Sequence, residues 1–221
     1  MVIGLTGTYC AGKNRVAEIL ESRGFPVLDV DKLGHVCLEN RRADVFARFG
    51  DDVKNPDGSV NRKKLGEKVF GSKPEMAALE AIVHPEANRM TLEWITARGG
   101  DSGGGETGKA CVVNAALLHK SAVFGRLGCI ILVHAPWLVR LVRAKRRDGL
   151  PWAVLMRRFA SQKQFASQYL TGNADIYRVR NPGFGKPVLP QDSGCGKTKP
   201  ERRLEQRIDE ILTELKLQGR I

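Results

Sequence analysis

The chain has 221 residues and a formal net charge of +12, with 36 Lys and Arg against 24 Asp and Glu. This length suffices for one sizeable α/β domain with a subdomain. No apolar run is long enough to cross a bilayer, and the N-terminus lacks the pattern of a secretory signal, so we expect no membrane partner. The positive charge favours polyanions such as nucleotides, phosphorylated cofactors or nucleic acid, or is simply a basic surface.

The cysteines predict a reducing compartment. Five of them are scattered along the chain without a C-x-x-C pair or the spacing of a metal site. Such usage is typical of the cytoplasm, where we expect the protein to reside. Cys10 lies inside a glycine loop, where it is either a small filler or a reactive thiol at a helix N-terminus.

The glycine loop near the N-terminus is the strongest motif. Residues 2–6 form an apolar run typical of a buried strand, and residues 15–20 have helical periodicity. Between them lies the G-x-x-x-x-G-K pattern of a phosphate-binding loop, formed by Gly7, Thr8, Tyr9, Cys10, Ala11, Gly12 and Lys13.

The loop has the parts that phosphate binding needs. Gly7 and Gly12 permit backbone angles that turn successive N–H groups into one concavity. The helix after the loop adds the positive end of its dipole, and Lys13 adds a full charge for the β- and γ-phosphates. We therefore predict that ATP binds between Gly7 and Arg15; the alternative is a glycine turn with a chance lysine.

Asn14 departs from the motif, which has Ser or Thr after the lysine to contact Mg²⁺. An amide oxygen is also a hard ligand. Asn14 therefore contacts Mg²⁺ directly, contacts it through water, or does not contact it.

Two acids follow the predicted second strand at residues 25–28. Asp29 and Asp31 stand where a strand ends, which is the edge at which α/β folds build their sites. A carboxylate there can accept a hydroxyl proton or hold metal-bound water. The alternative role for Asp31 is the N-cap of the next helix.

Residues 31–98 have a mostly helical pattern and form an insertion between strands. Residues 55–59 predict a turn, and His84-Pro85 predicts the end of one helix and the start of another. From its surroundings alone, His84 is interpreted as structural. The glycine-rich residues 99–108 predict a flexible surface loop without a phosphate role.

The second half of the chain predicts the rest of an α/β domain. Apolar runs at 110–113 and 129–133 are typical of central parallel strands, and residues 174–180 predict a last strand. Asn114 stands where a metal-supporting acid is expected. Helices at 137–147 and 152–164 form a basic hairpin, with seven cations against one acid between Arg140 and Arg158. We interpret this basic hairpin as a lid that closes over triphosphate. The alternatives are a solvated basic surface and a nucleic-acid contact face.

The order of these sequence segments along the chain resembles that of the dephospho-coenzyme A kinase family. The resemblance covers most of the chain and rests on an ordered set of segments. These are residues 3–13 with the phosphate loop, 26–31 (P-V-L-D-V-D), 57–62 (D-G-S-V-N-R), 79–85 (L-E-A-I-V-H-P), Arg143 with Arg147-Asp148, Gln162, Ala174-Asp175, and Asn181-Pro182-Gly183.

The resemblance implies a fold and an activity. The fold is a P-loop kinase with a five-stranded parallel sheet flanked by helices, a helical substrate domain and a helical lid. The activity is ATP-dependent phosphorylation of the ribose 3′-hydroxyl of dephospho-coenzyme A, the last step of coenzyme A biosynthesis. ATP and Mg²⁺ are the expected cofactors, and no nucleic acid is expected because the hairpin lacks aromatics interleaved to stack bases.

The resemblance also implies roles for individual residues. Asp31 is the expected base and Arg143 stabilises the transferring group from the lid. Arg62 and His84 lie in the substrate domain with Asp31. The nucleotide residues are Gly7, Thr8, Cys10, Ala11, Gly12, Lys13, Asn14, Arg15, Arg147, Asn181 and Gly183, the last two flanking adenine.

We predict three parts with these boundaries. The nucleotide-binding core comprises residues 1–30, 108–139 and 173–221. The substrate-binding domain comprises 31–107 with its glycine-rich loop, and the lid comprises 140–172.

Several residues depart from the family pattern and leave alternatives open. Asn14-Arg15 replaces Ser-Thr, Ala11 replaces a frequent Ser, and residues 114–120 lack the proline and glutamate of D-x-P-L-L-F-E; residues 184–200 resemble an insertion. The alternatives are another nucleoside or small-molecule P-loop kinase, and a nucleotide-binding protein with impaired catalysis.

Overall fold

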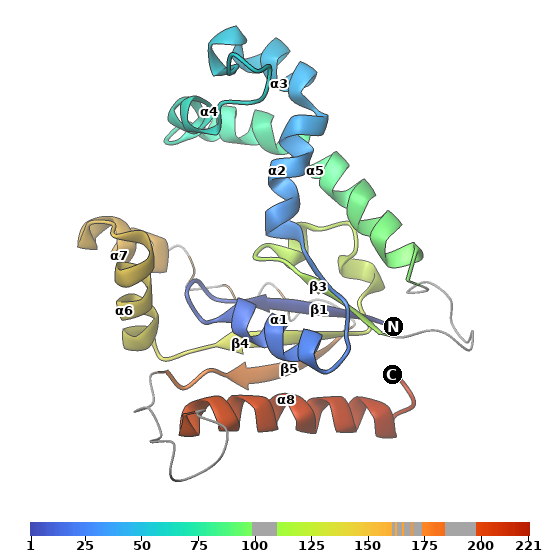
Figure 1. The fold of residues 1–221 in the computed structure, drawn as a ribbon. Coiled ribbons are helices and arrows are strands. Elements are labelled where there is room, and N and C mark those ends of the chain that lie inside the picture. The colour runs from blue at the N-terminus through green and yellow to red at the C-terminus, as the bar shows by residue number, and fades with distance from the viewer. Residues whose placement is uncertain (99–109, 161, 163–164, 166–168, 170–173, 184–197) are drawn as a thin grey trace. The chain divides into compact units, whose positions relative to one another are not determined.

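The computed structural model describes residues 1–98, 110–160, 162, 165, 169, 174–183 and 198–221. The helices and strands are labelled in Figure 1. In chain order they are β1 (Val2–Gly7), α1 (Lys13–Ser22), β2 (Val27–Asp29), α2 (Val30–Asn40), α3 (Arg42–Phe49), η1 (Asp51–Val53), α4 (Arg62–Val69), α5 (Lys73–Thr96), β3 (Cys111–Asn114), η2 (Leu118–Lys120), η3 (Phe124–Arg126), β4 (Cys129–His134), α6 (Trp137–Asp148), α7 (Trp152–Ala160), β5 (Asp175–Arg180) and α8 (Lys199–Leu217).

The strands of the described residues form one five-stranded sheet in the order β2-β3-β1-β4-β5. β1 pairs in parallel with β3 and with β4, and β4 pairs in parallel with β5. Every residue of β1 and β3 is buried, as expected for parallel strands covered on both faces. The predicted fold class, a parallel sheet flanked by helices, is confirmed.

The chain divides into two compact units. Unit 1 comprises Met1–Leu28 and Ile95–Ile221, and unit 2 comprises Asp29–Trp94. In unit 1, helices α1 and α8 bury their apolar faces together with the sheet, at positions such as Leu20, Ile208 and Leu215. Arg23, the C-cap residue of α1, donates to both carboxylate oxygens of Asp209 on α8, at 2.8 and 2.9 Å.

Unit 2 consists of helices around a small apolar core. The core residues come from α3, η1, α4 and the chain between them: Val45, Phe49, Val53, Val60, Leu65 and Val69. Asn61 caps α4 by accepting a hydrogen bond from the Lys64 N–H at 3.0 Å. The predicted turn at 55–59 is confirmed, because the Gly58 N–H donates to the Asn55 carbonyl and Asp57 accepts from the Ser59 N–H.

Helix α5 corrects one prediction. Pro85 does not divide the segment into two helices; it lies inside a single helix, Lys73–Thr96. Proline removes one helical hydrogen bond and crowds the preceding turn. Packing on both sides of it outweighs this local preference, because Leu79 and Ile82 pack on the core of unit 2 while Ile95, further along, is fully buried.

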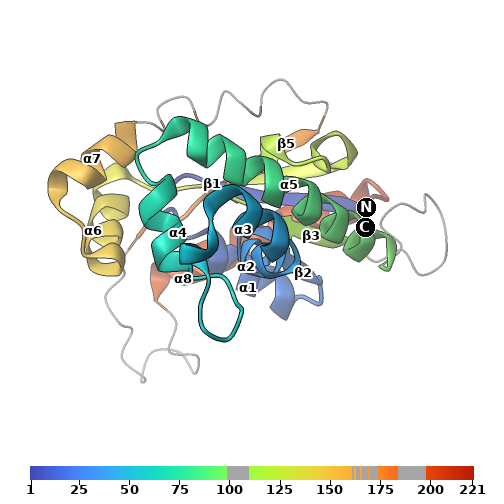
Figure 2. The same ribbon diagram turned by 90° about the horizontal axis from the view of Figure 1, so that it is seen from above.

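The remaining elements lie close to their predicted positions. Helices α6 and α7 form the predicted basic hairpin, and Figures 1 and 2 both show them side by side. The glycine-rich loop 99–108 and residues 184–197 lie outside the described residues. Among the helices that the structure describes, none combines the length and apolarity needed to cross a membrane.

Candidate active site

The phosphate loop, residues Gly7–Lys13, joins β1 directly to α1. Gly12 is the N-cap residue of α1 and has a φ of 92°, in the left-handed region that favours glycine. A Cβ atom at Gly12 would lie 2.2 Å from Nδ2 of Asn181. The second motif glycine is therefore required both for its backbone angles and for the close approach of Asn181.

Asn181 and Arg143 hold the loop at one carbonyl. Asn181 is only 7% exposed and donates from Nδ2 to the Ala11 carbonyl at 2.9 Å. Arg143 of α6 donates from Nη1 to the same carbonyl at 3.2 Å and from Nη2 to Oδ1 of Asn181 at 3.1 Å. Asn181, a predicted nucleotide residue, and Arg143, a predicted catalytic residue, thus meet at the predicted loop.

Helix α6 presents three arginines on one face, because Arg140, Arg143 and Arg147 are spaced i, i+3, i+7. Arg140 donates from Nε to the Tyr9 carbonyl at 2.8 Å, and Arg147 donates from Nε to Asp148 at 2.7 Å. Burial lowers the pKa of Arg140 and of Arg143, yet guanidinium groups stay charged in proteins. The loop is therefore surrounded by fixed positive charge.

The other predicted nucleotide residues lie on the loop, in the first turn of α1, or just after β5. Cys10 has a left-handed φ of 59°, and burial raises the pKa of its thiol, so a filler role fits better than a reactive thiol. Gly183 has a φ of 109°, and a Cβ atom there would lie 2.8 Å from Val139 of α6. Asn14 and Arg15 stand in the first turn of α1, where Asn14 is exposed.

Three buried side-chain oxygens have no hydrogen-bond partner among the described residues, and one of them is Oδ1 of Asp29, the last residue of β2. The other two are Oγ1 of Thr8, just after β1, and Oδ1 of Asn114, the last residue of β3. Asn114 is only 1% exposed. A buried oxygen without a partner calls for a water, an ion or a ligand. Both are hard oxygen donors of the kind that suit Mg²⁺ or the waters around it.

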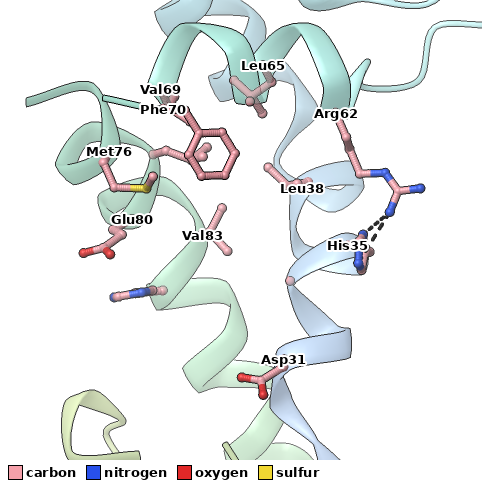
Figure 3. A pocket seen from close by; sticks show the side chains of 14 residues that line it. Asp31, His35, Leu38, Arg62, Leu65, Val69, Phe70, Met76, Glu80 and Val83 are labelled. Atoms are coloured by element: carbon pink, nitrogen blue, oxygen red, sulfur yellow. Dashed lines mark hydrogen bonds between the residues drawn. The ribbon is translucent and has the colours of Figure 1, made fainter. Parts of the chain in front are cut away.

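Unit 2 contains a separate pocket of about 360 Å³, which we call the acceptor pocket. Figure 3 shows side chains from α2, α4 and α5 around it. The apolar lining consists of Leu38, Leu65, Val69, Phe70, Met76, Leu79 and Val83. Phe70 is 73% exposed, so a large aromatic surface is open to a ligand.

The predicted acceptor residues Asp31, Arg62 and His84 all line this pocket, from three different helices. Asp31 lies in the first turn of α2, and the N-cap residue of that helix is Asp29. The alternative interpretation of Asp31 as the N-cap is therefore wrong. Arg62 contacts His35 across the pocket wall (Figure 3), and His84 lines the pocket although its sequence context suggested a structural role.

The predicted site residues thus form two groups. Lys13, Arg143, Arg147, Asn181 and the loop belong to unit 1, and Asp31, Arg62 and His84 belong to unit 2. Sequence reasoning included Tyr9 in the loop, Arg140 in the hairpin and Gln162 in the family resemblance, but it did not predict that they contact one another. The i, i+3, i+7 spacing of the α6 arginines would have identified Arg140, whereas nothing local to Tyr9 indicates its distant contacts.

Comparison with known proteins identifies relatives over most of the chain. Residues 1–177 match the family model described as dephospho-CoA kinase. The dephospho-CoA kinase of Treponema denticola is 30% identical over 188 residues, which cover 82% of this chain and 82% of that protein. The dephospho-CoA kinase of Anaeromyxobacter dehalogenans is 37% identical over 164 residues, covering 73% and 75%.

A solved structure matches nearly the whole chain. TT1252 from Thermus thermophilus superposes with a TM-score of 0.71 at 28% sequence identity, covering 97% of each chain. The family match ends before Asn181 and Gly183. Their place beside the phosphate loop and α6 is therefore information that the structure adds.

Proposed function

The chain belongs to the dephospho-CoA kinase family, the ATP-dependent phosphotransferases of coenzyme A biosynthesis, and from this premise we propose how its two groups of residues divide the reaction. Unit 1 holds ATP at the phosphate loop. Unit 2 holds dephospho-coenzyme A in the acceptor pocket and supplies the base. The γ-phosphoryl group of ATP passes to the ribose 3′-hydroxyl, giving coenzyme A and ADP.

The observation that carries the proposal is the loop held at Ala11 by Arg143 and Asn181. Phosphoryl transfer depends almost entirely on positioning and on neutralising charge. Glycine-permitted backbone N–H groups and the N-terminus of α1 hold the phosphates, and Lys13 supplies its charge to the β- and γ-phosphates. Arg143 stabilises the transferring group, Arg147 adds charge at the nucleotide, and Asn181 with Gly183 flanks adenine.

The acceptor pocket supports the second half of the proposal. Asp31 deprotonates and orients the 3′-hydroxyl as general base. Arg62 and His84 hold polar groups of dephospho-coenzyme A, since a guanidinium pairs well with diphosphate oxygens. The apolar wall around Phe70 and Val69 takes up the less polar pantetheine arm.

Mg²⁺ fits this chain through oxygen donors. The bound ion would neutralise charge on the β- and γ-phosphates. Asn14 would reach it from the first turn of α1, and the unpartnered oxygens of Thr8 and Asn114 would bind its waters. All three donors are neutral, so we propose that the ion is held mainly by ATP and water.

We propose that the core, the substrate domain and the lid predicted from the sequence have separate roles in the reaction. Residues 140–172 close over the nucleotide, and residues 31–107 carry the acceptor. Cytoplasmic residence is supported by the unpaired thiols of Cys10, Cys37 and Cys129 in the described part of the chain.

The test is an ADP-release assay with dephospho-coenzyme A, with coenzyme A (whose 3′ position is already phosphorylated), and with a panel of nucleosides. We expect ADP release with dephospho-coenzyme A alone, and one coenzyme A formed per ADP. Release with a nucleoside instead would identify another P-loop kinase. ATP binding without release on any acceptor would indicate a nucleotide-binding protein with impaired catalysis.

A further inference from the structure

Tyr9 of the phosphate loop contacts both helices of the α6–α7 hairpin (residues 137–160). Its hydroxyl donates to Oδ2 of Asp148, at the end of α6. Arg158 of α7 donates from Nη1 to the same hydroxyl at 3.3 Å. The phenol group therefore bridges the loop and the hairpin through two charged side chains.

The Tyr9 ring adds contacts that do not need the hydroxyl. The guanidinium carbons of Arg147 and Arg158 lie 5.2 and 5.8 Å from the ring centroid, within the range of cation–π attraction. Phe159 meets the ring edge-on, with centroids 5.7 Å apart. The ring thus packs against side chains of both hairpin helices.

The main chain of Tyr9 is held by the same part of the molecule. Its N–H donates to Oε1 of Gln162 at 2.7 Å, and its carbonyl accepts from Nε of Arg140 at 2.8 Å. Arg140 also donates to Gln162 at 3.3 Å and stacks over Phe159 at 4.7 Å. The hydroxyl, ring and carbonyl of this one loop residue contact the hairpin, and its N–H contacts Gln162, two residues after the end of α7.

Asp148 links Tyr9 to the arginines. It is the single acid between Arg140 and Arg158. It accepts from Nε and Nη2 of Arg147 at 2.7 and 3.2 Å, and Nη1 of Arg158 lies 3.6 Å from it. The Arg147 hydrogen bond lowers the pKa of Asp148, while burial raises the pKa of Tyr9. A protonated phenol therefore donates to an ionised carboxylate, which is the stronger kind of hydrogen bond.

We propose that Tyr9 is a positioning residue, which acts through Asp148 to fix Arg147 and Arg158 relative to the phosphate loop. The inference rests on the proposed function. Two arginines on a hairpin have many rotamers, and holding them beside the loop before ATP arrives removes part of the ordering cost of closure. Tyr9 itself does not contact the reacting atoms.

The decisive variant is Tyr9→Phe, which keeps the ring and removes the hydroxyl. We expect kcat/KM for ATP to fall about tenfold, from the loss of one charge-assisted hydrogen bond, with KM for dephospho-coenzyme A unchanged. Tyr9→Leu also removes the cation–π contacts, so its kcat/KM for ATP should fall further than that of Tyr9→Phe. Tyr177→Phe is the matched control, because Tyr177 donates to Glu214 at 3.3 Å and joins β5 to α8.

A double-mutant cycle with Asp148→Asn separates positioning from simple packing. If Tyr9 acts through Asp148, Tyr9→Phe costs less than about twofold once Asp148 is changed. An equal cost in both backgrounds, or wild-type kinetics of Tyr9→Phe despite a lower melting temperature, overturns the proposal.

Calorimetric titration of the same variants with ATP keeps this test independent of the acceptor. Tyr9→Phe should weaken ATP binding and Tyr177→Phe should not. If the wild-type protein binds ATP but does not phosphorylate dephospho-coenzyme A, the proposed function fails, while this binding difference still decides the role of Tyr9. Equal affinity of Tyr9→Phe and wild type overturns that role.

Discussion

The phosphate loop of unit 1 is held by directional hydrogen bonds, whereas the acceptor pocket of unit 2 is lined mainly by apolar side chains. Ala11 and Tyr9 each have carbonyls bonded to α6 arginines. The acceptor pocket instead offers Phe70, Val69 and Leu38, with Asp31, Arg62 and His84 among them. Directional bonds fix a geometry, which favours rate, while apolar contact favours affinity without fixing orientation. Changes in unit 1 should therefore affect turnover, and changes in the apolar wall should affect acceptor binding.

The largest effect is expected at Lys13, which we place at the β- and γ-phosphates. Lys13→Ala removes a charge aimed at the transferring group, and we expect kcat to fall about 10²–10³-fold, as for other lost transition-state donors. The variant should keep its melting temperature, because Lys13 begins α1 and is not part of the core. Lys216→Ala, at an exposed position of α8, is the matched control. Unchanged turnover of Lys13→Ala would refute the ATP site.

Asp31 tests whether unit 2 contributes to rate as well as to binding. Asp31→Asn keeps the shape and removes the base, so kcat should fall about 100-fold with KM for dephospho-coenzyme A nearly unchanged. Asp44→Asn controls for the loss of an acid in the first turn of a helix in the same unit. If Asp31→Asn has the wild-type kcat, Asp31 contributes only to helix α2 and the base lies elsewhere.

Local sequence patterns predicted the sheet and loop of unit 1 and most helices and strands of both units. The strand–loop–helix order predicted the phosphate loop, and the parallel sheet follows from the apolar runs at 110–113 and 129–133. The sequence predicts apolar helix faces around Leu65, Val69 and Leu79. It does not predict which of these faces line a pocket. That outcome depends on how three helices pack.

Contacts between distant segments set the limit of prediction. Tyr9 and Asp148 are 139 residues apart, and Asn181 meets Ala11 across 170 residues. No local pattern encodes such pairs. Pro85 shows the opposite failure, because the local rule was clear and tertiary packing outweighed it. The sequence therefore predicts which residue types belong to the candidate site, but not which distant residues they contact.

Phe70 offers a smaller and purely binding effect. Its side chain is 73% exposed in the acceptor pocket, so bound dephospho-coenzyme A can cover it. We expect Phe70→Ala to raise KM for dephospho-coenzyme A about tenfold, from the loss of apolar area worth ~1–2 kcal/mol, and to leave kcat unchanged. Leu217→Ala, at a leucine that is 85% exposed on α8, should change neither. A fall in kcat of Phe70→Ala with unchanged KM would mean that this wall orients the acceptor.

Asn14 gives the smallest effect and the finest test of unit 1. An amide must turn its oxygen, not its NH₂ group, toward Mg²⁺, and the ion keeps near-ideal octahedral geometry, so water readily replaces a displaced oxygen. We expect an enzyme that holds Mg²⁺ through ATP and water and relies on Lys13 and Arg143 for charge, so that Arg143→Ala costs turnover heavily. Asn14→Thr restores a compact hydroxyl and should lower the Mg²⁺ concentration for half-maximal rate about threefold, the gain of one modest polar contact.

Calorimetric titration of Mg²⁺ in the presence of a non-hydrolysable ATP analogue should show the same shift, and Asn14→Ala should show none. If Asn14→Thr raises the Mg²⁺ requirement, the amide is already a working ligand, and unit 1 fixes its metal as directly as it fixes its loop.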